Sequence, residues 1–222
     1  MRIAEAALST GDSPVVEIGP GKGALTEQLL SRAPHVYAIE VDTVLVHYLQ
    51  QRFRDAANLT ILNGDVMKTD LAQWGSVTVA GNLPYYITSP IIDKVLALGA
   101  LLVRAAFLVQ EEVAERLAAK PGSREYGYLS VATQSRCRVE KLFAVKAGAF
   151  RPPPKVDSAV VRLTPQGSPP EGFLEFASRC FAHKRKTLQN NVPAAAGQPE
   201  ARLRAEQLPV DQLLDLWRRL KA

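Results

Sequence analysis

Short apolar segments alternate with helix-like segments over the first half of the chain. The expected strands cover residues 14–18, 35–41, 59–62, 77–80 and 101–109, and the expected helices cover 24–31, 43–53 and 91–98. A strand followed by a helix and then by another strand normally belongs to a parallel sheet with helices on its faces. We therefore predict an α/β fold with a Rossmann-like, mostly parallel sheet.

The pattern changes after residue 110. The expected elements there are two helices, 111–119 and 128–134, and two late strands, 138–145 and 158–163. Such a late pair of strands is typical of an antiparallel edge on a parallel sheet. Residues 164–170 are rich in Pro and Gly and predict a linker, beyond which the chain is helical. We predict an α/β domain over 1–165 and a small all-helical domain over 168–222.

The net charge is concentrated near the C-terminus. Residues 176–222 contain nine Lys/Arg and four Asp/Glu, an excess that equals the formal net charge of the whole chain, +5. The first 175 residues contain 18 of each sign. Because positive charge attracts phosphate groups, this distribution favours an anionic partner, and Lys184, Arg185 and Lys186 are the candidate contacts. The alternative is that this basic run is only a solvated helix face.

Several protein classes do not fit the composition. No apolar run approaches the roughly 18 residues that span a bilayer, so we do not expect a membrane protein. Residues Met1–Glu5 lack the apolar core of a signal peptide, which indicates a cytoplasmic location. Cys137, Cys180 and the three histidines have no metal-ligand spacing, so we expect neither a disulfide framework nor a metal.

A glycine-rich turn, EIGPGKG at residues 17–23, lies between the first expected strand and the first helix. Glycines in such a turn allow the backbone to approach a ligand closely. Glu40 ends the next strand about 20 residues further on, where its carboxylate can accept both hydroxyls of a ribose. These features indicate an adenosine-containing cofactor without choosing it. Gly19, Gly21 and Ala24 also fit the looser NAD pattern, and a merely tight turn remains an alternative.

Polar residues also follow the third expected strand. Asp65, in the stretch NGDV, stands at the carboxyl edge of the sheet, where it can accept a hydrogen bond from an adenine amino group. Taken alone, it fits an ordinary turn. Acids or glycines at three successive strand ends, however, form a self-consistent nucleoside pocket on one rim of the sheet.

The stretch VTVAGNLPYYITSP extends this rim, and its strand should end where Gly81 interrupts the apolar run. The amino nitrogen of adenine is a poor nucleophile unless its N–H bonds meet acceptors. The Asn82 side-chain oxygen and the Leu83 carbonyl can supply them. Pro84 fixes the local backbone, and Tyr85 offers a ring for base stacking. The alternative is a turn with Asn and Pro beside a core tyrosine.

A second aromatic and basic segment is FRPPPKVD at residues 150–157. Three prolines after an aromatic residue form a stiff, extended segment that can hold the ring of Phe150 in place. Arg151 and Lys155 can meet phosphates. The alternative is a Pro-rich connection that leads into an edge strand.

Six segments together resemble one family: VVEIGPGKGALT, AIEVD, NGDVMKTD, GNLPYYITSP, FRPPPKVDSAVVRL and FAHKRKTLQNN, in this order. The chain is similar to the small-subunit ribosomal RNA adenine-N6 dimethyltransferases of the KsgA type, which are class I S-adenosylmethionine-dependent methyltransferases. The resemblance covers most of the chain. It implies a methyltransferase domain over 1–165 and an RNA-binding helical domain over 168–222.

The resemblance also implies roles for individual residues. It implies cofactor contacts from Gly19, Gly21, Glu40 and Asp65, to which we add Glu17 and Asn82, and target-base contacts from Asn82, Leu83, Pro84, Tyr85 and Phe150. It further implies that the C-terminal helical domain holds the RNA, and from their charge we expect RNA contacts from Arg151, Lys155, Lys184, Arg185 and Lys186. We expect methyl transfer to N6 of adenosines in small-subunit rRNA, with S-adenosylhomocysteine as product. The target base must be unstacked, and the enzyme is expected to be a monomer.

Three alternatives remain open at this point. The first is a large-subunit rRNA methyltransferase of the erythromycin-resistance type, although RKTLQNN and Pro90 favour the small-subunit type. The second is a DNA adenine methyltransferase, whose usual motif has two successive prolines. The third is a non-catalytic RNA-binding or assembly factor that keeps the fold.

The chain departs from the family pattern in two places. In the family, a segment with a GQ-F-L pattern precedes the first helix and covers the pocket, whereas Met1 stands almost at that helix. Without this segment, we expect cofactor affinity and activity to fall short of the full level. Tyr86 also occupies a position where relatives usually have Asn.

Overall fold

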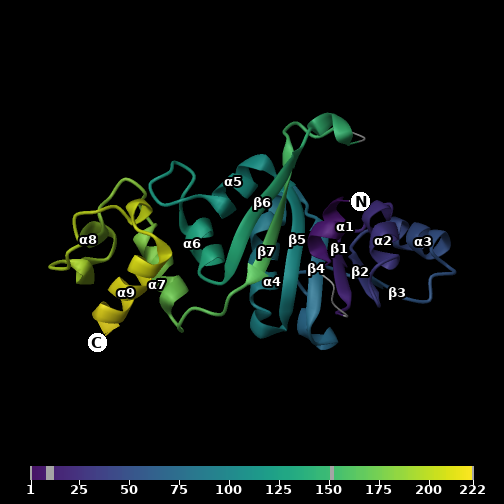
Figure 1. Ribbon diagram of the computed structural model, residues 1–222, viewed down its shortest axis with the longest axis horizontal. Helices are drawn as coiled ribbons and strands as arrows, with labels where there is room; N and C mark the ends of the chain where they lie inside the picture. The colour runs from purple at the N-terminus through teal and green to yellow at the C-terminus, as the bar shows by residue number, and fades with distance from the viewer. Residues whose placement is uncertain (1, 9–12, 151–152, 222) are drawn as a thin grey trace. The chain divides into compact units, whose positions relative to one another are not determined.

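The computed structural model describes residues 2–8, 13–150 and 153–221 (Figure 1). The chain divides into two compact units. The first contains residues 1–114 and 138–165, and the second contains residues 115–137 and 166–222. Because the chain leaves the first unit and returns to it, neither unit is a single continuous segment.

The first unit is built around a seven-stranded sheet with the order β3-β2-β1-β4-β5-β7-β6. The strands are β1 (Val15–Ile18), β2 (Val36–Glu40), β3 (Leu59–Asn63), β4 (Val77–Asn82), β5 (Leu102–Gln110), β6 (Cys137–Val145) and β7 (Ser158–Pro165). The first five strands pair in parallel, and β7 pairs antiparallel with β5. The prediction of a mostly parallel sheet with an antiparallel edge is therefore confirmed.

Helices pack on this sheet (Figure 1). They are α1 (Arg2–Ala7), α2 (Ala24–Leu30), α3 (Thr43–Arg52) and α4 (Thr88–Leu96), and α5 (Glu111–Ala118) follows β5 directly. α1 contacts β4 and β5, α3 contacts β2 and β3, and α4 contacts β5. The whole of β1 is buried, as expected for a central strand covered on both faces. In the described part of the chain, no helix combines the length and the apolar character needed to cross a membrane.

The expected end of the fourth strand was wrong. β4 continues through Gly81 to Asn82, and Gly81 pairs with Ile18 of β1 and with Phe107 of β5. A Cβ atom at Gly81 would lie 2.6 Å from the Ile18 carbonyl oxygen. Glycine is required here because β1 and β4 approach closely, so this residue permits the strand pairing instead of ending it.

Helix α4 also begins earlier than predicted. It starts at Thr88 and not at Ile91, so Pro90 lies within its first turn. Proline is tolerated there, since the N–H that it lacks would have no partner within the helix. The segment between β4 and α4 is consequently short, and it consists of Leu83, Pro84 and the 3₁₀ turn η2 (Tyr85–Ile87).

The second unit is helical. Its helices after α5 are α6 (Tyr128–Gln134), α7 (Phe173–Cys180), α8 (Leu188–Asn191) and α9 (Val210–Lys221). Tyr126 is fully buried in its core, and the phenol donates a hydrogen bond to the Leu208 carbonyl at 3.1 Å. Val131 belongs to the same core. These contacts place residues 115–137 in the helical unit, whereas the sequence pattern assigned them to the first domain.

Candidate active site

The first unit contains a pocket of about 660 Å³ at the carboxyl ends of β1, β2, β3 and β4. In the sheet, β1 lies between β2 and β4, so the order of the strands reverses at β1. Open α/β sheets bind ligands in the crevice that this reversal creates. The volume lies within the range of pockets that hold cofactors and small substrates.

The glycine-rich turn after β1 holds the carboxylate of Glu40. The backbone N–H of Gly21 donates to Glu40 Oε2 at 3.1 Å, and the N–H of Asp42 donates to Oε1 at 3.1 Å. Gly19 and Gly21 have φ angles of 66° and 58°, a left-handed conformation that side chains other than glycine's rarely adopt. The turn therefore fixes the orientation of an acidic side chain that is only 6% exposed and lines the pocket.

Glu17 belongs to β1 and directly precedes Ile18, which lines the pocket. It is 1% exposed, and its Oε2 has no hydrogen-bond partner among the described residues. Burial, together with the nearby charge of Glu40, raises the pKa of Glu17 to about 7. Hydrogen bonds from Thr26 act in the opposite direction and lower the pKa.

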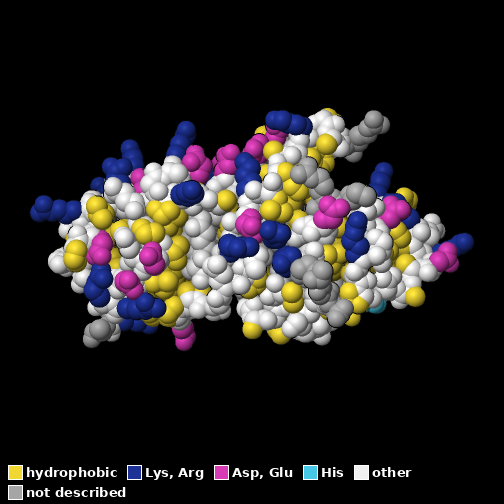
Figure 2. Space-filling model, in the orientation of Figure 1, with side chains coloured by type: hydrophobic (Ala, Val, Ile, Leu, Met, Phe, Trp, Pro, Cys, Tyr) yellow, Lys and Arg dark blue, Asp and Glu magenta, His cyan; other side chains and the backbone are white. Residues whose placement is uncertain are grey.

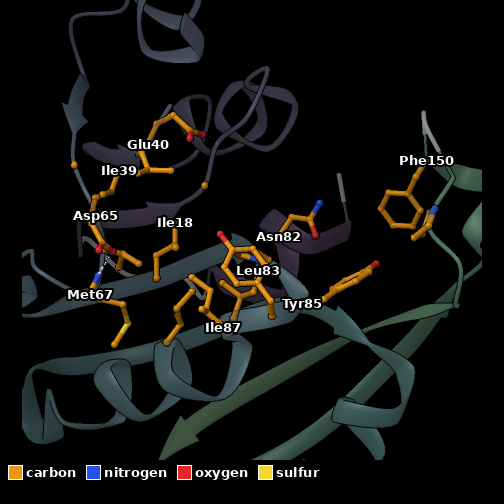
Figure 3. A pocket seen from close by; sticks show the side chains of 18 residues that line it. Ile18, Ile39, Glu40, Asp65, Met67, Asn82, Leu83, Tyr85, Ile87 and Phe150 are labelled. Atoms are coloured by element: carbon orange, nitrogen blue, oxygen red, sulfur yellow. Dashed lines mark hydrogen bonds between the residues drawn. The ribbon is translucent and has the colours of Figure 1, made fainter. Parts of the chain in front are cut away.

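Asp65 lines the same end of the pocket as Glu40 (Figure 3). Its Oδ1 accepts a hydrogen bond from the Met67 N–H at 2.8 Å, drawn as a dashed line in Figure 3. This bond closes a turn directly after β3 and holds the carboxylate at the rim. Both acids are thus oriented before any ligand binds.

The residues after β4 form the middle of the pocket wall. The Leu83 N–H donates to the Leu108 carbonyl at 3.0 Å, which extends the pairing with β5 by one residue. The Pro84 carbonyl accepts from Ile87 N–H and from the Thr88 hydroxyl, so the chain turns sharply here. These bonds orient the Asn82 side chain and the Tyr85 ring along the pocket.

Figure 3 shows how the side chains divide the pocket. Glu40 and Asp65 lie at one end, Phe150 lies at the other, and Asn82 and Tyr85 lie between them. Acidic groups that suit a nucleoside therefore occupy one end, and aromatic rings that suit a base occupy the other. One cavity can accommodate two ligands side by side.

Most of the predicted site residues of the first unit lie together. Those that line the pocket are Gly19, Glu40, Asp65, Asn82, Leu83, Pro84, Tyr85 and Phe150. Glu17 and Gly21 adjoin it without lining it. Lys155 is exposed and follows Pro154, which lines the pocket, whereas Arg151 lies outside the described residues. Their roles toward cofactor, base and RNA stay predictions.

The sequence did not indicate the apolar part of the lining. Ile39, Val41 and Met67 line the pocket, and Val41 is 68% exposed. Each stands within two residues of a predicted site residue. Such an apolar residue reads as core in the sequence, because an apolar pattern does not reveal which strand ends remain open.

The basic run of the second unit lies in an exposed turn. Residues 183–186 connect α7 to α8, and the Lys186 N–H donates to the His183 carbonyl at 2.9 Å. Lys184 Nζ donates to the Arg124 carbonyl at 2.5 Å. The alternative of a solvated helix face is therefore wrong in its geometry. Figure 2 shows Lys and Arg side chains projecting from the surface of this unit.

The sequence as a whole matches a known family. Residues 1–217 match the family model described as ribosomal RNA adenine dimethylase. The chain belongs to this family. A relative in Acidobacterium capsulatum, named ribosomal RNA small subunit methyltransferase A, is 44% identical over 99% of this chain and 85% of its own length.

Two solved structures have the same architecture as this family member. A dimethyladenosine transferase from Plasmodium falciparum is 26% identical, with a TM-score of 0.87 over 99% of this chain and 94% of that one. The 23S rRNA methyltransferase ErmE is 30% identical, with a TM-score of 0.76 over 100% and 96% of the two chains. The expected family and the expected class I methyltransferase fold are both confirmed.

Proposed function

We propose that this chain transfers methyl groups from S-adenosylmethionine to N6 of adenosines in small-subunit ribosomal RNA during ribosome maturation. Family membership makes it an S-adenosylmethionine-dependent rRNA adenine dimethyltransferase. The small subunit as substrate follows from the names of curated relatives. The observation that carries the proposal for the site is one pocket with Glu40 and Asp65 at one end, Phe150 at the other, and Asn82 and Tyr85 between them. Two adjacent adenosines would each receive two methyl groups.

The acidic end of the pocket fits the cofactor. Glu40, already held by Gly21, would accept the ribose hydroxyls, and Asp65 would accept from the adenine amino group. Glu17, with its unpartnered oxygen, lies next to the turn that would face the rest of the cofactor. S-adenosylmethionine supplies a methyl group activated by a positively charged sulfur, so neither a metal nor a strongly basic side chain is required for the transfer.

The aromatic end of the pocket fits the target base. The Asn82 side-chain oxygen and the Leu83 carbonyl would accept the two N–H bonds of the adenine amino group, which keeps the nitrogen lone pair available for attack. Pro84 fixes the backbone that carries both acceptors, and Tyr85 and Phe150 would stack on the two faces of the base. Because a base stacked in a duplex cannot present its amino group to such a pocket, the substrate would be a loop or a flipped nucleotide.

The exposed basic residues would hold the RNA backbone. Lys184, Arg185 and Lys186 in the second unit and Lys155, which follows the pocket residue Pro154, would supply positive charge without base selectivity. Arg151 is proposed for the same role from its charge alone. The helical unit is thus the proposed RNA-binding part of a monomeric, cytoplasmic enzyme that acts on rRNA within the small ribosomal subunit.

Isotope-labelled S-adenosylmethionine tests this proposal. The chain is incubated separately with unmethylated small and large ribosomal subunits, and the nucleosides are analysed by mass spectrometry. We expect N6,N6-dimethyladenosine in small-subunit rRNA. Label only in large-subunit rRNA would instead support the activity that the name of ErmE gives, and RNA binding without label would support a non-catalytic assembly factor.

A further inference from the structure

Tyr85 is tied to the start of β7 by a hydrogen bond between hydroxyl groups. The Tyr85 hydroxyl and Ser158 Oγ share a hydrogen bond of 2.8 Å, in which either oxygen can donate. Ser158 is fully buried, begins β7, and pairs with Gln110 of β5. It does not line the pocket. The ring of Tyr85 is therefore held at its outer end by a residue fixed in the sheet.

The neighbouring residue, Asp157, holds the turn that leads to Phe150. Its Oδ1 accepts from the Ala147 N–H at 3.0 Å, and its Oδ2 accepts from Lys146 Nζ at 2.7 Å. Ala147 begins the 3₁₀ turn η4 (Ala147–Ala149), and the Phe150 N–H donates to the Ala147 carbonyl at 3.2 Å. The Asp157 carbonyl in turn accepts from the Glu111 N–H at 3.0 Å, which connects it to the end of β5.

Two consecutive residues thus hold the Tyr85 ring and the turn that leads to Phe150, two of the aromatic residues that line the pocket. We propose that Asp157 and Ser158 are positioning residues that set the separation and tilt of Phe150 and Tyr85 for the target adenine. This inference rests on the proposed function, because it requires the base to lie between these rings. Its physical basis is that the Tyr85 hydroxyl is bonded to Ser158 and the turn before Phe150 is bonded to Asp157, so both aromatic residues follow segments fixed to the start of one strand. A pre-aligned base reacts faster than one that must first be oriented.

Removing either hydroxyl of the hydrogen-bonded pair tests the role of Ser158. We expect Ser158→Ala and Tyr85→Phe each to lower kcat about 3- to 10-fold at saturating RNA, the effect of one lost hydrogen bond. The double variant should be no slower than the slower single variant, because both changes remove the same bond. Affinity for S-adenosylhomocysteine should stay at the wild-type value. If Ser158→Ala does not fold, Tyr85→Phe still tests the bond, since the ring is only half-buried.

The sheet offers a matched control for this pair. Ser13 Oγ and Thr78 Oγ1 share a similar hydroxyl hydrogen bond of 3.1 Å, and Thr78 stands near the start of β4, at the edge opposite the pocket. Thr78→Val removes one buried hydroxyl bond without touching the pocket. We expect it to lower stability as Ser158→Ala does while leaving kcat unchanged. Equal losses of kcat in both variants would overturn the positioning role.

Asp157 has a control of its own. Asp157→Ala should lower kcat because it frees the turn that carries Phe150, and combining it with Phe150→Ala should add little. Lys146→Ala removes only the ion-pair partner of Asp157. The Lys146 side chain is 82% exposed. Exposed ion pairs contribute little, so we expect kcat close to that of the wild type.

Tyr85→Ala distinguishes failure of the proposed target-base site from failure of the positioning role of Asp157 and Ser158. Full activity of Tyr85→Ala would show that the target base does not stack there, and the proposed site would fail. Loss of activity in Tyr85→Ala, combined with wild-type kcat in Ser158→Ala, Tyr85→Phe and Asp157→Ala, would overturn the positioning proposal alone.

Discussion

The two units of the chain differ in their net charge and in how deeply their functional charged side chains are buried. The first unit contains 14 Lys/Arg and 14 Asp/Glu, and its site acids Glu17 and Glu40 are almost fully buried. The second contains 13 Lys/Arg and eight Asp/Glu, and Lys184, Arg185 and Lys186 are exposed. Buried, oriented groups select a ligand, whereas exposed surplus charge attracts any phosphate backbone. We infer that base choice belongs to the first unit and most of the RNA affinity to the second.

The largest effect is expected in the pocket, from Asn82→Ala. Removing one preorganised acceptor for the target amino group should lower turnover on the order of 100- to 1,000-fold. Affinity for S-adenosylhomocysteine should remain largely intact, because Asn82 acts mainly on the base. Methylation kinetics and calorimetry measure the two quantities. Near-normal turnover would show that Asn82 in the first unit does not activate the target base.

Glu17 gives the first unit a predicted pH dependence. Its carboxyl ionises near pH 4.5 in the unfolded chain and near pH 7 in the folded one, so the folded state loses stability as the pH rises between these values. Glu17→Gln removes this loss. At pH 8, it should exceed the wild type in unfolding free energy by up to about 3 kcal/mol, a gain that disappears near pH 4.5.

Denaturant unfolding at several pH values measures this difference. Glu27→Gln replaces an exposed carboxylate on α2 and controls for the loss of one negative charge. A Glu17→Gln gain that is the same at pH 4.5 and pH 8 would show that the carboxyl is not the titrating group.

The cofactor end of the pocket should respond to Glu40→Ala. This change removes a carboxylate that accepts hydrogen bonds from the ribose, so affinity for S-adenosylhomocysteine should fall about 10- to 100-fold. Calorimetry on the folded variant is the measurement, and NAD should not bind measurably to either protein. Unchanged affinity in the variant, or tight NAD binding by the wild type, would contradict the cofactor assignment.

The smallest and most salt-sensitive effect is expected in the second unit. Changing Lys184, Arg185 and Lys186 to Ala should weaken RNA binding and flatten its log–log salt dependence by up to about 0.7–0.9 per lost phosphate contact. Arg54→Ala, an exposed charge of the first unit, should leave the slope unchanged. RNA titrations at several salt concentrations decide between a binding segment and a solvated turn, for which neither slope nor affinity would change.

The alternation of strands and helices along the chain and the place of the acids were predictable because they depend on local patterns. Apolar strands alternate with helices, and parallel strands end at one edge, so Glu40 and Asp65 had to lie on the same rim. The bounds of most elements followed within one or two residues. Gly81 misled the prediction, because its role depends on the distance to Ile18 in a neighbouring strand.

Contacts between distant residues could not be predicted. The bond between Tyr85 and Ser158 joins residues 73 positions apart, and nothing in either local pattern indicates it. Likewise, the helices around Tyr126 have ordinary amphipathic patterns, and only packing with Leu208 places them in the second unit. Periodicity shows that a face is buried, but not against which partner.

Single-turnover methylation at saturating RNA tests most directly whether base choice belongs to the first unit and RNA affinity to the second. The Lys184, Arg185 and Lys186 triple Ala variant should reach the wild-type rate once RNA is saturating, because its defect is in affinity. Asn82→Ala should stay about 100-fold or more slower at any RNA concentration, since its defect is in the chemical step. A triple variant that remains slow at saturation, or an Asn82→Ala variant that recovers with RNA, would contradict the assignment of base choice to the first unit and RNA affinity to the second.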